Sequence, residues 1–275
     1  MLEIINSEDM LAPIAINKKL DSIAEAVDAI VEAIKSGGRL FYVGAGTSGR
    51  LGVLDAAECP PTFGTDPELV KAIIAGGSEA LFHAVEGAED SEELGRTAIA
   101  DNNINGKDVV VGITASGRTP FVLAAIREAK RVGAKTVGIS NNNQSLIKKL
   151  ADIDITLLVG PEVIMGSTRM KSGTSQKLVL NMITTAVMIK LGRVYGNLMV
   201  DLRPTNVKLV DRAVRIVMHA TGINECEAKK YLELSGMNPK VAIVMYKTQT
   251  DKETAVSLLS QNMGFVTKAI SNTQA

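Results

Sequence analysis

The sequence is poor in residues that several classes of protein need. Tryptophan is absent from the 275 residues and aromatic side chains make up only 3%, so a stacking platform for bases or sugar rings is not expected. Lysine plus arginine and aspartate plus glutamate both number 30, which gives a net charge of zero. This balance argues against nucleic-acid and membrane-surface partners, which favour a basic excess.

Cysteine and long apolar runs are also scarce. Cys59 and Cys226 are the two cysteines and lie far apart in the sequence, which argues against a disulfide framework and favours a reduced, cytoplasmic chain. No apolar run reaches the roughly 18 residues of a membrane span, and the first residues lack the layout of a signal peptide. His83 and His219 have no partner at metal-ligand spacing, so a metal site is not expected.

What the chain does contain is a repeated strand–loop–helix pattern between Arg39 and about Gly160. Five short runs are almost continuously apolar, which is typical of parallel strands covered on both faces. Helical stretches such as Pro120–Val132 lie between them. The alternation predicts an α/β fold with a doubly wound parallel sheet, whose ligands bind at the carboxyl ends of the strands. The predicted strands are Leu40–Val43, Val70–Ala75, Val109–Ile113, Thr136–Ile139 and Ile155–Val159.

Composition divides the chain into three parts. Residues 1–36 read as an N-terminal helical segment, because apolar residues recur at spacings of three and four before a Gly-Gly pair. Residues 37–200 hold the predicted sheet and end with a long apolar helix, at about Ser172–Leu191. Residues 201–275 form a small, all-helical C-terminal domain with short helices separated by polar and glycine residues.

Two of the predicted strands end in loops of glycine and hydroxyl residues. One strand is followed by Gly44-Ala-Gly-Thr-Ser-Gly-Arg50, and another by Thr114-Ala-Ser-Gly-Arg-Thr119. A loop of this kind at the start of a helix offers free backbone N–H groups, hydroxyl donors and a positive helix end, which together bind phosphate. Two such loops in one domain indicate a phosphorylated small molecule held between them.

The first loop also matches the glycine spacing of a dinucleotide-binding turn. That fingerprint needs an acidic residue at the end of the next strand, about 20 residues further on. The segment Asp55–Pro61 stands in that region, and its proline pair is expected to end a helix instead. Thr47, Ser48 and Arg50 fit a phosphomonoester better. Turns or helix caps without any ligand remain the alternative for both loops.

Three glutamates are candidates for proton transfer. Glu58 directly precedes Cys59-Pro60-Pro61, while Glu86 and Glu89 lie in the segment Val85–Asp90. On its own, each of these side chains is ordinarily a solvated surface group. Two carboxylates could serve as an acid and a base only if the fold brings them to the strand ends.

With these motifs in view, the chain resembles the N-acetylmuramic acid 6-phosphate etherase family, from about Leu2 to the C-terminal helices. The resemblance implies the sugar isomerase (SIS) fold, which is a flavodoxin-like sheet with helices on both sides and a small helical bundle at the C-terminus. It also implies a cytoplasmic homodimer that uses no metal, nucleotide or other cofactor. The segments that carry the resemblance are Gly44–Gly52, Ala57–Thr62, Ala84–Asp90, Thr114–Pro120 and Gly196–Asp201.

The resemblance implies cleavage of the D-lactyl ether of N-acetylmuramic acid 6-phosphate, which gives N-acetylglucosamine 6-phosphate and D-lactate during the recycling of cell-wall amino sugars. It makes Glu58 the acid at the lactate oxygen and Glu89 the base at C2, with the opposite division of roles left open. Ser167 and Lys171, together with Glu162, are expected to touch the substrate or a partner subunit. The residues expected to hold the 6-phosphate are Thr47, Ser48, Gly49, Ser116, Gly117, Arg118 and Thr119.

Two other classes share these loops. A sugar-phosphate-binding regulator needs the phosphate loops but neither glutamate, and an aldose–ketose isomerase removes the C2 proton without releasing lactate. The segment Ala57–Pro61 favours the etherase. Members of that family begin with a longer polar arm before the position of Leu2, and if the arm helps to close the active site, this chain is expected to be less active.

Overall fold

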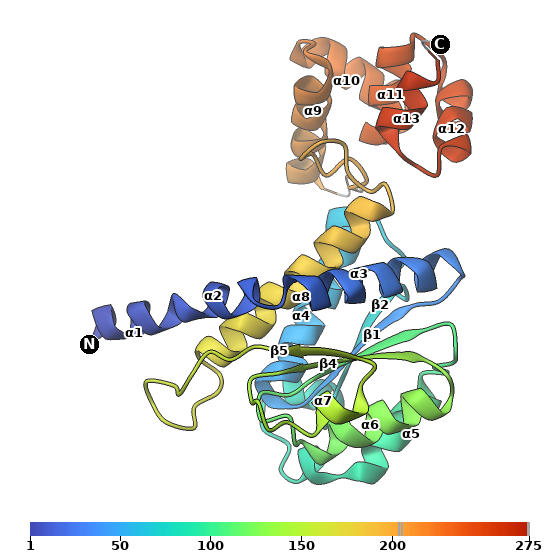
Figure 1. The fold of residues 1–275 in the computed structure, drawn as a ribbon. Coiled ribbons are helices and arrows are strands. Elements are labelled where there is room, and N and C mark those ends of the chain that lie inside the picture. The colour runs from blue at the N-terminus through green and yellow to red at the C-terminus, as the bar shows by residue number, and fades with distance from the viewer. Residues whose placement is uncertain (203, 205, 274–275) are drawn as a thin grey trace. The chain divides into compact units, whose positions relative to one another are not determined.

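The computed structural model describes residues 1–202, 204 and 206–273 of the chain (Figure 1). Contacts within the chain divide it into two units. The first joins Met1–Ala57 with Pro67–Thr185, and the second joins Glu58–Asp66 with Ala186–Ala275. This division differs from the one that composition suggests, because residues 1–36 belong with the sheet and residues 186–200 belong with the C-terminal helices.

The first unit contains a five-stranded parallel sheet in the order β2-β1-β3-β4-β5. The doubly wound α/β fold predicted from the sequence is therefore confirmed. The fifth strand begins two residues and ends three residues earlier than expected, and it is followed by a non-strand segment in which Leu157 and Val159 are buried and Leu158 is exposed. The strands are β1 (Leu40–Gly44), β2 (Val70–Ile74), β3 (Val109–Ile113), β4 (Lys135–Ser140) and β5 (Ile153–Thr156).

Helices cover both faces of this sheet (Figure 1). One face packs against α5, α6 and α7, where Phe41, Val43 and Val110 join the apolar side chains of α6 in a single buried cluster. The other face is covered by α3, α4 and α8. The helices of this part of the chain are α1 (Leu2–Asp9), α2 (Leu11–Asn17), α3 (Leu20–Lys35), α4 (Gly46–Phe63), α5 (Glu92–Asp101), α6 (Pro120–Arg131), α7 (Ile147–Leu150) and α8 (Lys171–Lys190), with two short 3₁₀ turns, η1 (Gly77–Leu81) and η2 (Ala88–Asp90).

The proline pair does not end its helix where the sequence suggests. Helix α4 continues through Pro60 and Pro61 to Phe63. A proline inside a helix loses one backbone hydrogen bond and crowds the preceding turn, but here both prolines fall in the last turn. The carbonyl of Pro60 accepts a hydrogen bond from the Gly64 N–H at 2.9 Å, so the turn is completed before the chain leaves the helix.

The second unit has its own apolar core. Buried side chains from all five helices after residue 206 pack together with Val200 and Leu202. Side chains of Asn206, Asn224, Asn238 and Asp251 each accept a hydrogen bond from the first turn of the helix that follows, as helix caps do. The helices are α9 (Val207–Thr221), α10 (Glu225–Leu234), α11 (Pro239–Thr248), α12 (Lys252–Gln261) and α13 (Val266–Ser271).

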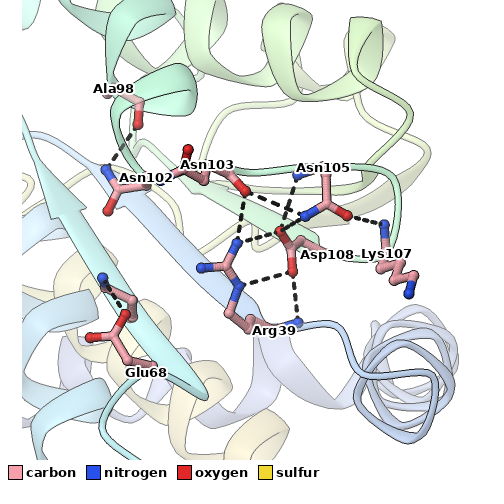
Figure 2. A network of polar contacts seen from close by, with 9 residues as sticks. Arg39, Glu68, Ala98, Asn102, Asn103, Asn105, Lys107 and Asp108 are labelled. Atoms are coloured by element: carbon pink, nitrogen blue, oxygen red, sulfur yellow. Dashed lines mark hydrogen bonds and ion pairs between the residues drawn. The ribbon is translucent and has the colours of Figure 1, made fainter.

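A polar network lies at the amino ends of β1 and β3 (Figure 2). The glycine loops lie at the opposite, carboxyl ends of these strands. The buried carboxylate of Asp108 accepts hydrogen bonds from the backbone N–H of Arg39 at 2.8 Å and from the Arg39 guanidinium at 2.8 Å and 3.2 Å. The guanidinium also donates to the carbonyl of Asn103 at 2.9 Å. Because Arg39 and Asp108 directly precede β1 and β3, these bonds fix how the two strands pair.

A second buried carboxylate joins β1, α4 and α8. Asp55 of α4 is 4% exposed and accepts hydrogen bonds from the Tyr42 hydroxyl at 2.9 Å, the Asn181 amide at 2.6 Å and the Thr184 hydroxyl at 3.2 Å. Burial raises the pKa of Asp55, although these hydrogen bonds and the positive charge of Lys177 act in the opposite direction. This side chain therefore links α4 to both β1 and α8.

The raised pKa of Asp55 predicts a pH effect on stability. Between the ordinary carboxyl pKa and the raised one, the folded chain binds more protons than the unfolded chain, so the free energy of unfolding falls as pH rises. We expect Asp55→Asn to remove this slope and Asp55→Ala to lower stability by about 1–3 kcal/mol, because it leaves buried donors without an acceptor. Urea unfolding of the three proteins from pH 4 to 7 measures both effects. A wild-type protein that gains stability over Asp55→Asn as pH rises would contradict the prediction.

Candidate active site

The two glycine loops form one pocket at the carboxyl ends of the strands. We call it the loop pocket, and its volume is about 230 Å³. Both loops contribute hydroxyl side chains, and a single carboxylate, that of Glu89, completes the lining. The lining residues are Ala45, Gly46, Thr47, Ser48, Glu89, Thr114, Ala115, Ser116, Thr119 and Thr168.

Strand pairing is what brings the loops together. β1 and β3 are neighbours in the sheet, and their last residues, Gly44 and Ile113, are register partners. Helix α4 begins at Gly46 and α6 at Pro120, so the first turn of one helix and the cap of the other border the same pocket. The partial positive charge of two helix ends and their free N–H groups favour an anion there.

The second loop is held in shape by its own hydroxyl groups. The Thr114 hydroxyl lies 2.9 Å from that of Thr119 and 3.3 Å from that of Ser116, while the Arg118 N–H donates to the Ser116 hydroxyl at 3.2 Å. Gly117 has a φ of +70°, and a Cβ at this position would lie 2.0 Å from the Cβ of Ser145. Gly117 and Arg118 thus shape the loop, and its hydroxyl residues line the pocket.

Amide side chains hold the first loop in place. The Ser48 hydroxyl donates to Gln176 of α8 at 2.8 Å, and the Gln176 amide donates to Asn141 at 2.9 Å. Gly49 does not line the loop pocket but packs closely, since a Cβ there would lie 2.6 Å from the side chain of Ile74 and 2.9 Å from the carbonyl oxygen of Gly44. Its role in this structure is the tight turn between β1 and α4.

A second pocket adjoins the loop pocket and shares Ala45, Gly46 and Glu89 with it. Its volume is also about 230 Å³. The sequence suggests that Arg50 contacts phosphate, but its guanidinium lines this second pocket and donates to the backbone carbonyls of Leu81 at 3.1 Å and His83 at 3.4 Å. We call it the alanine pocket; its remaining lining residues are Ala75, Ala80, His83, Ala84, Val85, Glu86, Gly87, Ala88 and Asp90.

Besides Gly49, Arg50, Gly117 and Arg118, three further predicted residues do not line the loop pocket. Glu58 is an exposed residue of α4, ten positions beyond Ser48. Ser167 lies in the loop before α8, where its neighbour Thr168 lines the pocket instead. Lys171 is 1% exposed, and its ammonium group forms an ion pair with Glu8 of α1.

Glu162 also has a structural partner. Its carboxylate accepts hydrogen bonds from the backbone N–H groups of Lys171 at 3.2 Å and Ser172 at 3.0 Å. It therefore satisfies donors in the first turn of α8 that have no partner within the helix.

Sequence reasoning missed Thr114, Thr168 and the alanine pocket. A signal for Thr114 was present, because it is the first residue after a buried strand that ends in a glycine-containing loop. The sequence contains no comparable signal for Thr168, because a hydroxyl residue before a helix is also typical of a helix cap. Among residues 1–202, 204 and 206–273, no group of three or more histidine, cysteine or acidic side chains is arranged to hold a metal ion.

Comparison with known proteins decides the family. Models of the "Glucokinase regulatory protein N-terminal SIS domain" and of the "SIS domain" match residues 22–130 and 86–186. An N-acetylmuramic acid 6-phosphate etherase from Clostridium acetobutylicum is 62% identical over 270 residues, which cover 98% of this chain and 89% of that protein. The chain belongs to the N-acetylmuramic acid 6-phosphate etherase family. The etherase from Glaesserella parasuis is 56% identical over 268 residues, covering 98% and 88% of the two chains.

Solved structures place this etherase-family chain in the SIS fold. A phosphoheptose isomerase from Francisella tularensis has a TM-score of 0.54 at 20% identity and covers 68% of this chain and 98% of its own. The phosphoheptose isomerase from Neisseria gonorrhoeae has a TM-score of 0.54 at 16% identity, with 68% and 96% covered. The SIS fold that the sequence motifs imply is thereby confirmed. In the described part of the chain, no helix has both the length and the apolar character needed to cross a membrane.

The geometry of Gly117 predicts a binding defect. We expect Gly117→Ala to abolish measurable binding of glucose 6-phosphate, because the new methyl group collides with Ser145 and displaces the loop. Gly37→Ala is the matched control, since Gly37 also has a positive φ of 82° but has no atom within 4 Å of its Cβ position. Gly37→Ala should lose about 1–2 kcal/mol of stability for its left-handed backbone alone, and Gly117→Ala should lose more because of the collision. Calorimetric titration that finds equal affinity in the two variants would contradict the role given to Gly117.

Proposed function

We propose that this chain is a carbon–oxygen lyase that cleaves the D-lactyl ether of N-acetylmuramic acid 6-phosphate, giving N-acetylglucosamine 6-phosphate and D-lactate. The observation that carries the proposal is the position of Glu89, whose carboxylate shares one pocket with two loops suited to a phosphate group. The curated relatives with more than half of their residues identical are named for this reaction. Neither a regulator nor an isomerase is favoured by these names.

The chemistry needs one proton removed from C2 and one proton delivered to the ether oxygen on C3. An ether resists hydrolysis at neutral pH, but in the open-chain sugar the C2–H bond lies beside the C1 aldehyde and is acidified. A base takes the C2 proton, an acid protonates the oxygen that leaves with lactate, and water then adds to the C2–C3 double bond. Two positioned carboxyl groups can supply each of these steps.

We assign Glu89 as the base at C2 and Glu58 as the acid at the lactate oxygen and the water. Thr47, Ser48, Ser116 and Thr119 hold the 6-phosphate with the N–H groups of both loops. We assign no phosphate contact to Ser167 or Lys171, because neither residue lines the loop pocket. The reaction takes place in the cytoplasm, as expected for a chain with two widely separated cysteines.

We infer that Glu58 reaches this site from a second copy of the chain, and the length of α4 supports this. Ser48 and Glu58 lie ten residues apart on one helix, which corresponds to about 15 Å along its axis. A phosphate bound beyond the first turn of α4 is therefore far from Glu58 of the same chain, while C3 of the sugar is only a few bonds from the phosphate. The pair can meet over one substrate in a homodimer.

The exposed face of α4 fits such a pairing. Leu54 is 51% exposed, and Ala57 and Glu58 are exposed beside it. Two copies of α4 packed antiparallel around Leu54 would bury this side chain and place Glu58 of one copy beside Arg50 of the other, because both positions lie four residues from Leu54. Arg50 borders the alanine pocket, next to Glu89.

The first test is lactate release from N-acetylmuramic acid 6-phosphate in water enriched in oxygen-18. Elimination followed by hydration predicts label at C3 of N-acetylglucosamine 6-phosphate and unlabelled D-lactate, both visible by mass spectrometry. Lactate without label in the sugar would contradict this mechanism. Binding of the substrate without lactate release would favour the regulator, and interconversion of aldose and ketose would favour the isomerase.

Mixed dimers test where Glu58 acts. Glu58→Gln and Glu89→Gln should each lower the rate about 100- to 10,000-fold. When the two variants are co-expressed, half of the dimers carry one of each chain. If Glu58 acts across the interface, each of these dimers has one intact site, and lactate release recovers to about one quarter of the wild-type rate. Tandem-affinity purification verifies that heterodimers are present. If they are present and lactate release does not recover, either both glutamates act within one chain or Glu58 takes no part in the reaction.

A further inference from the structure

The alanine pocket is a cavity to which the proposed reaction assigns no role. Part of its wall is small and apolar, since the buried residues Ala75, Ala80 and Ala88 line it, while charged and polar side chains form the rest. The backbone at Gly76 packs tightly against Val85, which lines the pocket, because a Cβ at Gly76 would lie 2.8 Å from the Cβ of Val85. Arg50 holds the segment between these two residues through the carbonyls of Leu81 and His83.

The charges around this pocket are mainly negative. Glu86, Glu89 and Asp90 contribute three carboxylates. The guanidinium of Arg50 contributes one positive charge and is already directed at backbone carbonyls. A negatively charged group placed here would face repulsion, whereas a neutral group with an N–H donor and a methyl could pair with a carboxylate and an apolar wall.

The substrate of the proposed reaction offers one group of each kind next to the reacting bond. The lactyl ether at C3 ends in a carboxylate, and the acetamido group at C2 is neutral, with one N–H and one methyl. With Glu89 acting at C2, the acetamido nitrogen is attached to the carbon that Glu89 deprotonates. Glu89 lines both pockets, so with Glu89 as the base the alanine pocket adjoins the C2 position of a sugar phosphate held in the loop pocket.

We propose that the alanine pocket binds the 2-acetamido group and selects the length of the acyl chain on the sugar. This inference rests on the proposed function, because it takes Glu89 as the base at C2. The phosphate fixes one end of the substrate, and the acetamido group fixes the other. Two such points of attachment orient the C2–H bond toward the carboxylate of Glu89.

The test changes the size of the pocket and the size of the acyl group together. Val85→Ala removes two methyl groups from the wall, and Ala84→Leu adds bulk at an exposed lining position. The substrates are N-acetyl-, N-propionyl- and N-butyrylmuramic acid 6-phosphate, and lactate release gives kcat/KM for each. Val256→Ala is the control, because Val256 is 46% exposed and lies on α12, in the other unit of the chain.

We expect the wild type and Val256→Ala to prefer the N-acetyl substrate. Val85→Ala should raise kcat/KM for N-butyryl relative to N-acetyl by about tenfold, the effect of matching a pocket to added methylenes. Ala84→Leu should disfavour N-butyryl most strongly. A gain on the larger substrate cannot arise from partial unfolding, which lowers all three rates.

Two outcomes overturn the inference in different ways. If the wild type releases lactate but neither variant changes the preference among acyl groups, the acetamido group binds elsewhere while the proposed function stands. If the wild type releases lactate from none of the three substrates, the proposed function itself fails, and this inference fails with it.

Discussion

The structure depends on the pairing of β1 with β3. The chain leaves β1 toward β2 on one side and leaves β3 toward β4 on the other, so the two connections diverge and open a crevice at the carboxyl ends of the neighbouring strands. Each of the two strands ends in a loop that starts a helix, and the crevice therefore collects two sets of free N–H groups. The bonds between Arg39 and Asp108 at the opposite edge hold the same two strands in register.

Buried polar side chains then fix the helices that border the crevice. Asp55 joins β1, α4 and α8, and Gln176 joins Ser48 of the first loop to Asn141, in the segment after β4. Apolar contacts alone would allow α4 to shift along the sheet at small cost, because they have little directional preference. Hydrogen bonds in a buried site do have direction, and leaving one unmade is costly. These hydrogen bonds therefore fix the position of the helices and of the loop that border the loop pocket.

Much of this arrangement could be predicted from the sequence. The apolar runs located the strands to within about two residues, and the glycine and hydroxyl loops located the pocket, because both signals are local. The partners of Arg50 and Lys171 could not be predicted, since a partner far away in the sequence leaves no local pattern. The alanine pocket could not be predicted either, because its small residues are also typical of a tight turn. Glu58 shows a further limit, because the motif that contains it does not reveal that this residue stands outside the loop pocket.

The continuous helix α4 has one more consequence, for the evolution of this chain. The first loop lies at its start and Glu58 near its end, with no irregular segment between them. Each residue of an α-helix adds about 100° of rotation and 1.5 Å of length. An insertion or deletion of a single residue between Thr47 and Glu58 would turn Glu58 and Leu54 away from their present face, and could not be absorbed as it is in a loop. Sequences that keep this chemistry should therefore vary in residue type along α4 while its length stays constant.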